Sequence, residues 1–548
     1  MDPEKQNNPH SNNTTPTKVS LEYDQHGPSP STLQQEKAKE LEDGVDSETV
    51  RTRQEEEEER DLELGTEFTT RPEEGQKVPD KDPNLVEWDG PDDPENPQNF
   101  SRMRKWLITM ILSTLTVWIT FSSSVFSEAT LVTAKEYHVA TEVTTLATSL
   151  PVFGFAVGPL VWGPLSELYG RKYPLFFGYT VFAIFQIPVA VAQNLQTILV
   201  CRFFIGFFGC APLAIVGGAL ADIWDPVDRA VAIAWFSAAT FGGPTFGPIL
   251  GGFIVQSHLG WRWTAWITLI ASSFFALIAF FIVPETYHPV LLQRRAARLR
   301  LETRNWALHS ALDERRPTLH DIVVRYLLRP IQMLILEPIL LCVSIYLALI
   351  YGILYLTFEA YPVSFQEVRG WTHAGVAALP FLSILVGVLF GSLLIMAVTK
   401  TRFARKLKKH GRVVPEERLP PMIIASVLLP AGLFWFGWTS NAHVSWVPQV
   451  IAGVPIGLGI LVIFMQGLNY IIDVYMMFAN SAIAANTLLR SGLGGAFPLF
   501  AVQMYHKLGV NWASSLLGFL TAAMVPIPIL FFFYGAKLRA MSRFKPRF

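Results

Sequence analysis

From Trp106 onward, the chain consists mainly of apolar segments of about 20 residues that alternate with short charged connections. A helix of 20 residues rises about 30 Å, which matches the thickness of the hydrocarbon core of a bilayer. The sequence therefore predicts an all-α membrane protein with twelve transmembrane helices. They lie near residues 106–127, 143–165, 174–193, 197–222, 231–255, 263–283, 335–357, 375–398, 422–440, 446–469, 478–503 and 513–534.

Charge separates a tail from this apolar body. Of the 44 Lys and Arg and 45 Asp and Glu residues in the chain, residues 1–100 hold 10 and 27, a net charge of −17. The body, residues 101–548, holds the remaining 34 and 18, a net charge of +16. The tail is rich in Asn, Ser, Thr, Pro, Glu and Gln and lacks apolar periodicity, so we expect it to be disordered. Its start has neither the basic residues nor the apolar stretch of a secretory signal.

The twelve segments fall into two sets of six, separated by an Arg-rich connection. This arrangement predicts two six-helix bundles with a binding site between them. The N-terminal bundle would occupy residues 101–284, and a cytoplasmic central loop would occupy residues 285–333. The C-terminal bundle would follow at residues 334–536, and a basic cytoplasmic tail at residues 537–548.

The distribution of Lys and Arg over the short connections predicts the orientation, because basic loops remain on the cytoplasmic side. With the acidic tail inside, the inner side receives most of these residues, including the runs 400–418 and 537–547. The outer side receives only Lys135, Arg262, Arg369 and Lys507. We therefore expect a multi-pass protein with both termini in the cytoplasm.

Several kinds of chemistry find no support in the sequence. There is no G-x-x-x-x-G-K-[ST] loop for ATP, no H-E-x-x-H zinc motif and no G-x-S-x-G hydrolase motif. The three cysteines lie inside apolar segments, so neither a disulfide framework nor a zinc site can be inferred. We expect no enzyme activity, no catalytic or metal-binding residues, no cofactor and no nucleic-acid partner.

A loop with a distinctive composition closes the second apolar segment. Residues 163–172 read Gly-Pro-Leu-Ser-Glu-Leu-Tyr-Gly-Arg-Lys. Gly163 and Gly170 would allow a tight turn and close helix approach. Glu167 could face the positive N-terminal end of a neighbouring helix, and Arg171 could pair with a carboxylate at the cytoplasmic surface.

This loop resembles the G-x-L-x-D-x-x-G-R-K motif of the major facilitator superfamily, with Glu167 where many members have Asp. The resemblance implies that Glu167 contacts the inner end of the eleventh segment. It also implies that Arg171, followed by Lys172, pairs with an acid at the inner end of the fourth segment, which here is Asp222. We expect this pair to act as a cytoplasmic gate; a role in topology alone is the alternative.

The fifth segment carries closely spaced glycines and prolines. Small residues let helices approach each other closely, and prolines bend them. The stretch resembles the G-P-x-x-G-P-x-x-G-G motif that distinguishes antiporters within the superfamily, although general packing would also explain it. The matching residues are Gly243, Pro244, Gly247, Pro248, Gly251 and Gly252.

Arg202 lies inside the fourth apolar segment, about five residues from its outer end. An unpaired cation at membrane depth costs about 2.5–3.5 kcal/mol on insertion scales, so we expect a partner or a water-filled cavity. It matches an arginine of the superfamily that is linked there to proton coupling. The alternative is that its side chain extends to the outer interface.

Further stretches narrow the resemblance to the fungal twelve-span drug:proton antiporter family. They are Trp-Asp-Gly-Pro-Asp-Asp-Pro-Glu-Asn-Pro-Gln-Asn at 88–99, Trp-Arg-Trp at 261–263, Pro-Glu-Thr-Tyr at 284–287, Phe-Glu-Ala-Tyr-Pro at 358–362, Ser-Ala-Ile-Ala-Ala-Asn at 481–486, Arg-Ser at 490–491 and Phe-Pro-Leu-Phe at 497–500. The likeness covers the chain from about residue 86 onward.

The resemblance implies the major facilitator fold and export of hydrophobic drugs, fungicides or endogenous toxins, driven by protons. It implies a monomer in the fungal plasma membrane whose partners are small hydrophobic substrates, protons and the lipid bilayer. The alternatives are a nutrient facilitator or symporter of the same fold, and a membrane receptor that transports nothing.

A site for varied hydrophobic molecules needs aromatic and weakly polar side chains. Each aromatic residue could instead face lipid or pack. The acids Glu128, Glu337, Glu359 and Asp473 all lie near segment ends, so no single proton carrier is assigned. The candidate cavity residues are Trp118, Ser122, Ser123, Ser124, Phe236, Tyr351, Tyr355, Gln466, Asn469, Tyr470, Asn486 and Arg490.

Overall fold

A computed structural model describes residues 82–314, 324–410, 414–542 and 544. All of them belong to one unit, Gly75–Phe548. The described residues form helices joined by short turns, and the one isolated β-bridge among them joins Leu85 to His309. Most of the predicted acidic tail, residues 1–81, lies outside the described residues.

The first six predicted segments become helices. Two of them are broken: α5 and α6 meet at Gly158 and Pro159 with a bend of 41°, and Pro212 follows the break between α8 and α9. Proline lacks the N–H that would continue the helical hydrogen-bond ladder. The helices are α3 (Arg102–Ser124), α4 (Thr130–Glu136), α5 (Thr141–Val157), α6 (Pro159–Leu168), α7 (Lys172–Ala190), α8 (Leu195–Gly209), α9 (Ala211–Ile223), α10 (Pro226–Gln256) and α11 (Trp263–Ile282).

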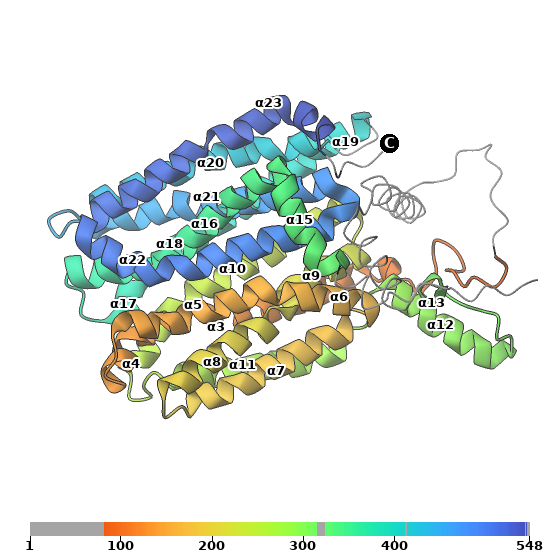
Figure 1. Cartoon of the computed structure of the whole chain (residues 1–548), viewed down its shortest axis with the longest axis horizontal. Coiled ribbons are helices and arrows are strands. Elements are labelled where there is room, and N and C mark those ends of the chain that lie inside the picture. The colour runs from red at the N-terminus through yellow and green to blue at the C-terminus, as the bar shows by residue number, and fades with distance from the viewer. Residues whose placement is uncertain (1–81, 315–323, 411–413, 543, 545–548) are drawn as a thin grey trace, which may run out of the picture. The chain divides into compact units, whose positions relative to one another are not determined.

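The second half begins after the connection that contains α12 (His288–Thr303) and α13 (Ala311–Glu314). Figure 1 shows α12 and α13 lying apart from the long helices, which run alongside one another. The helices of this half are α15 (Arg329–Leu336), α16 (Pro338–Pro362), α17 (Ala374–Ala378), α18 (Phe381–Val398), α19 (Ala404–His410), α20 (Leu419–Thr439), α21 (Trp446–Tyr475), α22 (Ala479–Met524) and α23 (Pro526–Ala540).

Within the described chain, ten helical stretches are long and apolar enough to cross a membrane, or eleven if α5 and α6 count as one span. The difference from the twelve predicted segments arises at the C-terminal end, where Ala479–Ala540 counts as one stretch of 62 residues. Gly509 interrupts this stretch with a φ of +74° and a ψ of 158°, which are not helical values. The last two predicted segments lie on either side of that glycine.

The buried apolar side chains form two cores. One consists of residues from α3 to α11, and the other consists mainly of residues from α15 to α23. Val152 of α5 and Phe241 of α10 belong to the second core although they lie in the first half of the chain. Helix α5 packs against α22, and α10 packs against α18, so these four helices join the two halves.

The prediction of disorder is wrong for residues 82–100, which we call the strap. The Asp93 carboxylate is buried and accepts hydrogen bonds from the backbone N–H groups of Asp89 and Glu95. Arg295 of α12 also binds this carboxylate and is the largest cause that lowers the pKa of Asp93, to about 2. The strap is ordered because α12 supplies the cation that its acidic turn requires.

Candidate functional site

The predicted cytoplasmic gate pair is in contact. The Nε atom of Arg171, just before α7, lies 3.1 Å from the Oδ2 atom of Asp222, in the last turn of α9. Both side chains are about 15% exposed, so water only partly screens the pair. The Arg171 guanidinium also donates to Ser166 and lies 4.5 Å from the ring centre of Tyr287.

Glu285 holds the start of α7 in place. Its carboxylate accepts hydrogen bonds from the backbone N–H groups of Arg171, at 2.8 Å, and Lys172, at 3.2 Å. A negative charge at this position also favours the helix N-terminus. Gly170 has a φ of +88°, and a Cβ there would lie 2.3 Å from Glu285 Oε2, so only glycine fits. Glu285 belongs to the Pro-Glu-Thr-Tyr stretch at 284–287, but that stretch alone did not predict this role.

Glu167 also lies where the motif predicted it. The Asn480 side chain, in the first turn of α22, donates a hydrogen bond of 2.8 Å to its carboxylate. This contact joins the two halves of the chain. Gly163 forms neither the predicted tight turn nor a close helix contact. It lies inside α6, and a Cβ there would meet no atom within 4 Å. Lys172 extends its Nζ atom over the Phe280 ring, 4.9 Å from the ring centre.

The second half contains an equivalent pair that was not predicted from the sequence. Arg418 Nε lies 2.8 Å from Asp473 Oδ2, and both side chains are about as buried as those of the first pair. Arg418 immediately precedes α20, which forms the third predicted span of its half, and Asp473 lies near the end of α21, the fourth. Arg171 and Asp222 hold the same positions in the first half. The six-plus-six repeat was the signal that could have identified this pair.

Arg202 is buried, with 2% of its surface exposed, and does not extend to the outer interface. Its guanidinium donates to three backbone oxygens: Ala147 at 2.7 Å, Ser122 at 2.7 Å and Ser123 at 3.4 Å. It also lies 5.0 Å from the centre of the Phe126 ring. The partners of this cation are therefore carbonyl dipoles at the end of α3 and on α5.

The glycines of the fifth segment lie against neighbouring backbone. A Cβ at Gly243 would lie 2.0 Å from Thr120 Oγ1, and one at Gly247 would lie 1.9 Å from Ser124 Oγ. Gly251 meets the Val125 carbonyl in the same way. These residues pack α10 along α3. Gly252 faces the other half of the chain, where a Cβ would lie 2.6 Å from the backbone nitrogen of Gly375.

Several predicted cavity residues meet between the two halves. Ser123 Oγ and Tyr355 Oη share a hydrogen bond of 3.1 Å, which joins α3 to α16. The rings of Tyr355 and Tyr351 are 5.1 Å apart, and Tyr351 stacks on Phe464 of α21 at 6.2 Å. Arg490 of α22 lies over Tyr351, with 4.7 Å from its Cζ to the ring centre. We call Tyr351, Tyr355, Phe464 and Arg490 the central cluster.

Other predicted cavity residues lie elsewhere. Trp118 stacks on Phe275 of α11, and Tyr470 stacks on Phe531 of α23. Phe236 packs on the core of the first half, Ser122 accepts from Gln186, and Ser124 donates to the Phe121 carbonyl. Asn469 is half-buried. Gln466 and Asn486 are buried, and each carries side-chain atoms without a hydrogen-bond partner.

Two acids lie near the ends of helices in different halves of the chain. Glu128 follows α3, and Glu359 lies one helical turn beyond Tyr355 on α16. One buried oxygen of each carboxylate has no hydrogen-bond partner among the described residues.

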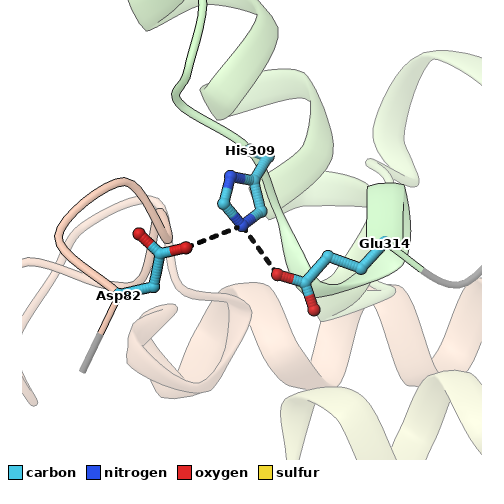
Figure 2. Close-up of side chains that lie close together, drawn as sticks. All are labelled: Asp82, His309 and Glu314. Carbon is cyan, nitrogen blue, oxygen red and sulfur yellow. Dashed lines mark hydrogen bonds and ion pairs between the residues drawn. The ribbon is translucent and has the colours of Figure 1, made fainter. Parts of the chain in front are cut away.

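A separate group links the strap to the central connection. Figure 2 shows Asp82 and Glu314 on either side of the His309 imidazole, whose Nε2 atom lies 3.6 Å and 2.7 Å from their oxygens. The Ala307 carbonyl, 2.9 Å from Nδ1, is the first cause that raises the pKa of His309, and Glu314 is the second. With acceptors at both nitrogens, the protonated ring fits this position best.

The sequence also matches a known protein family. The sequence profile of the Major Facilitator Superfamily matches residues 106–498. The chain belongs to the major facilitator superfamily. It is a multi-pass membrane protein with the fold of that superfamily, as the sequence predicted.

Two relatives from within the superfamily are fungal. The citrinin biosynthesis cluster MFS transporter mrr1 of Monascus ruber is 67% identical over 473 residues, which is 86% of this chain and 95% of that protein. The ascochitine biosynthesis cluster MFS transporter of Didymella fabae is 62% identical over 476 residues, which is 87% of this chain and 92% of that protein. These relatives confirm the predicted likeness to fungal efflux transporters and fit the prediction that the chain is not an enzyme.

A solved structure shares the fold. The proton:xylose symporter XylE, bound to 6-bromo-6-deoxy-D-glucose, superposes with a TM-score of 0.55 at 14% sequence identity. The match covers 79% of this chain and 96% of that protein. At this identity the likeness concerns the fold alone.

Proposed function

We propose that this protein is a proton-coupled antiporter that exports small hydrophobic metabolites made by a fungal cell. The observation that carries the proposal is its 67% and 62% identity to transporters named for citrinin and ascochitine biosynthesis clusters. A cell that synthesises a toxin needs to remove it, and a transporter of this fold can couple removal to an existing ion gradient. We place the protein in the plasma membrane, as a monomer with both termini in the cytoplasm.

Alternating access requires contacts that hold one side closed and are released in the other state. Glu167–Asn480, between the two halves, is such a contact on the inner side. The pair Arg171–Asp222 holds α7 against α9 beside it, and Arg418–Asp473 does the same in the second half. Protonation or rearrangement of these groups would favour the inward-facing state.

We assign proton binding to Glu128 and Glu359. One oxygen of each carboxylate is buried without a hydrogen-bond partner among the described residues, so it is free to bind a proton. The two acids lie on opposite halves of the chain near the predicted outer ends of their helices, so opening toward the outer side would expose them to external protons. This position suits a group that couples proton entry to the conformational change.

Citrinin and ascochitine serve as test compounds. Full-length protein in proteoliposomes should accumulate one of them in the lumen when the lumen is acidic, because protons then leave through the transporter. A nutrient symporter is the second candidate, and it would move its substrate in the same direction as the protons. Transport of neither compound under any gradient would contradict the proposal.

A further inference from the structure

Arg490 is a cation that pairs with no carboxylate among the described residues. It lies on α22, 11 residues from the start of the helix, and its Cζ lies 4.7 Å from the Tyr351 ring centre and 4.9 Å from that of Phe464. Its Nε atom has no hydrogen-bond partner, and among the described residues it forms no ion pair. The guanidinium is therefore held by two aromatic faces while part of its donor fork remains free.

Arg202 shows how this chain satisfies a buried arginine that serves structure. Three backbone carbonyls receive its N–H groups, and only 2% of its surface is exposed. Arg490 remains half-buried and is not satisfied in this way. Since burying a charge without hydrogen bonds is costly, this contrast indicates that a partner of Arg490 comes from outside the chain.

Two buried amides, on α22 and α21, also carry atoms without hydrogen-bond partners among the described residues. Asn486 precedes it by one helical turn on α22, is fully buried, and has a hydrogen-bond partner for neither Nδ2 nor Oδ1. Gln466 lies two residues after Phe464 on α21, and its Oε1 atom is also without a partner. A buried amide with free donors and acceptors destabilises the fold unless something binds it, and binding sites are where such groups gather.

The walls of this region are aromatic. Tyr351 stacks on Phe464 with 27° between the ring planes, and Phe241 of α10 approaches Phe464 edge-on at 5.2 Å. Planar conjugated molecules bind well against such faces, and a guanidinium fork recognises a carboxylate or enolate through two parallel hydrogen bonds. The free groups thus match a flat ligand with one anionic edge and further polar groups.

We infer that the transported substrates are planar, conjugated organic anions whose acidic group binds Arg490 while their ring stacks on Tyr351 and Phe464. Asn486 and Gln466 bind the remaining oxygens of the substrate. This inference rests on the proposed export function and narrows its substrate class.

The test is a binding measurement on full-length purified protein in detergent, by equilibrium dialysis without any proton gradient. The probes are 2-naphthoate and 2-naphthamide, which share ring and size and differ in charge. Wild-type protein should bind the carboxylate about tenfold or more tightly than the amide, since hydrogen bonds to a charged group contribute at least that much. The substitution Arg490→Gln should remove this preference and leave the affinity for 2-naphthamide within about twofold.

Two further variants control for folding and surface charge. Arg490→Lys should retain a preference for the carboxylate, and Arg262→Gln, which removes an outer-surface cation paired with Glu136, should bind both probes like wild type. Equal affinities of wild type for the two probes, or no binding of either, would overturn the inference, as would Arg490→Gln with its preference intact. Gradient-driven export of neutral compounds alone would preserve the export function and still overturn the anion site. Selective binding of 2-naphthoate without gradient-driven transport would support the anion site and contradict the export function.

Discussion

At the scale of single residues, the cytoplasmic gate pair is the most direct link between a motif and a geometry. Asp222 and Arg171 are only about 15% exposed, yet a part-exposed pair of this kind contributes only about 0–1 kcal/mol to stability. Folding should therefore survive its loss. A conformational equilibrium between two access states is balanced closely enough for the same energy to change the population of each state.

We predict that Asp222→Asn and Arg171→Ala each reduce export severalfold while the amount of protein at the cell surface remains near that of wild type. Export is measured in intact cells and normalised to surface-labelled protein. Glu302→Gln, on exposed α12 and away from the gate, is the control. Normal export by both gate variants at matched surface amount would mean that the pair only stabilises the loop at residues 163–172 and does not act as a gate.

The acid pair gives a second prediction at this scale. Glu359→Gln and Glu128→Gln should each abolish the response of export to a pH gradient, because an amide cannot carry the proton. Exchange of substrate across the membrane without a gradient should continue. Glu367→Gln is the matched control, since Glu367 lies on the same outer side, exposed and paired with His506. A normal gradient response in both acid variants would exclude this pair as the proton site.

At the scale of elements, the strap and α12 form a clasp held by charge. The lowered pKa of Asp93, about 2, means that this contact stabilises the strap above the ordinary pKa of an aspartate and is lost as pH falls toward 2. The raised pKa of His309 gives the opposite dependence of the strap's stability on pH. Its ion pairs are complete below the ordinary pKa of a histidine and are lost as pH rises through the raised value.

We therefore predict that hydrogen exchange of backbone amides near residue 84 quickens as pH rises through the raised pKa of His309, after correction for the intrinsic rate, while amides of residues 89–95 remain protected. Arg295→Ala should release residues 89–95 at any pH, because Arg295 binds Asp89 and Asp93 together. Arg304→Ala, at the exposed end of α12, is the control. Protection that does not depend on pH near residue 84 would mean that His309 does not hold the strap.

The strap leads to different predictions for two truncations of the N-terminus. Removing residues 1–81 should leave export per surface molecule nearly unchanged, because their composition offers no packing surface. Removing residues 1–100 should impair it, because Trp88 of the strap contacts His288, whose ring bonds the Asp222 carbonyl beside the gate. Equal export by the two truncated proteins would show that the strap has no part in transport.

The elements differ in how far the sequence could predict them. Hydrophobic length located the spans, since burial in lipid depends on composition more than on neighbours. The ordered structure of the strap could not be predicted from its own sequence, because Asp93 is held by Arg295, some 200 residues away along the chain. The motif loop predicted Arg171–Asp222, but the partners of Arg202 are backbone oxygens that no residue pattern reveals.

At the scale of the whole molecule, the proposed export requires two halves that move against each other around a central site. The halves touch at the predicted inner side through Glu167 and Asn480, in the middle through Ser123 and Tyr355, and at the predicted outer side through Gly252 against Gly375. An exporter of anions driven by inward proton flow would move positive charge inward in each cycle. We expect an inside-negative membrane potential to accelerate it, as a potassium diffusion potential in vesicles can establish.

The most direct test of the account follows the test metabolite and protons together in proteoliposomes of the full chain. With an acidic lumen and a neutral bath, the metabolite should accumulate in the lumen above its bath concentration while protons leave, and a protonophore should abolish the accumulation. Equilibration to the bath concentration, unchanged by the protonophore, would identify a facilitator. Accumulation only when the gradient is reversed would identify a symporter, and either result would contradict proton-driven export.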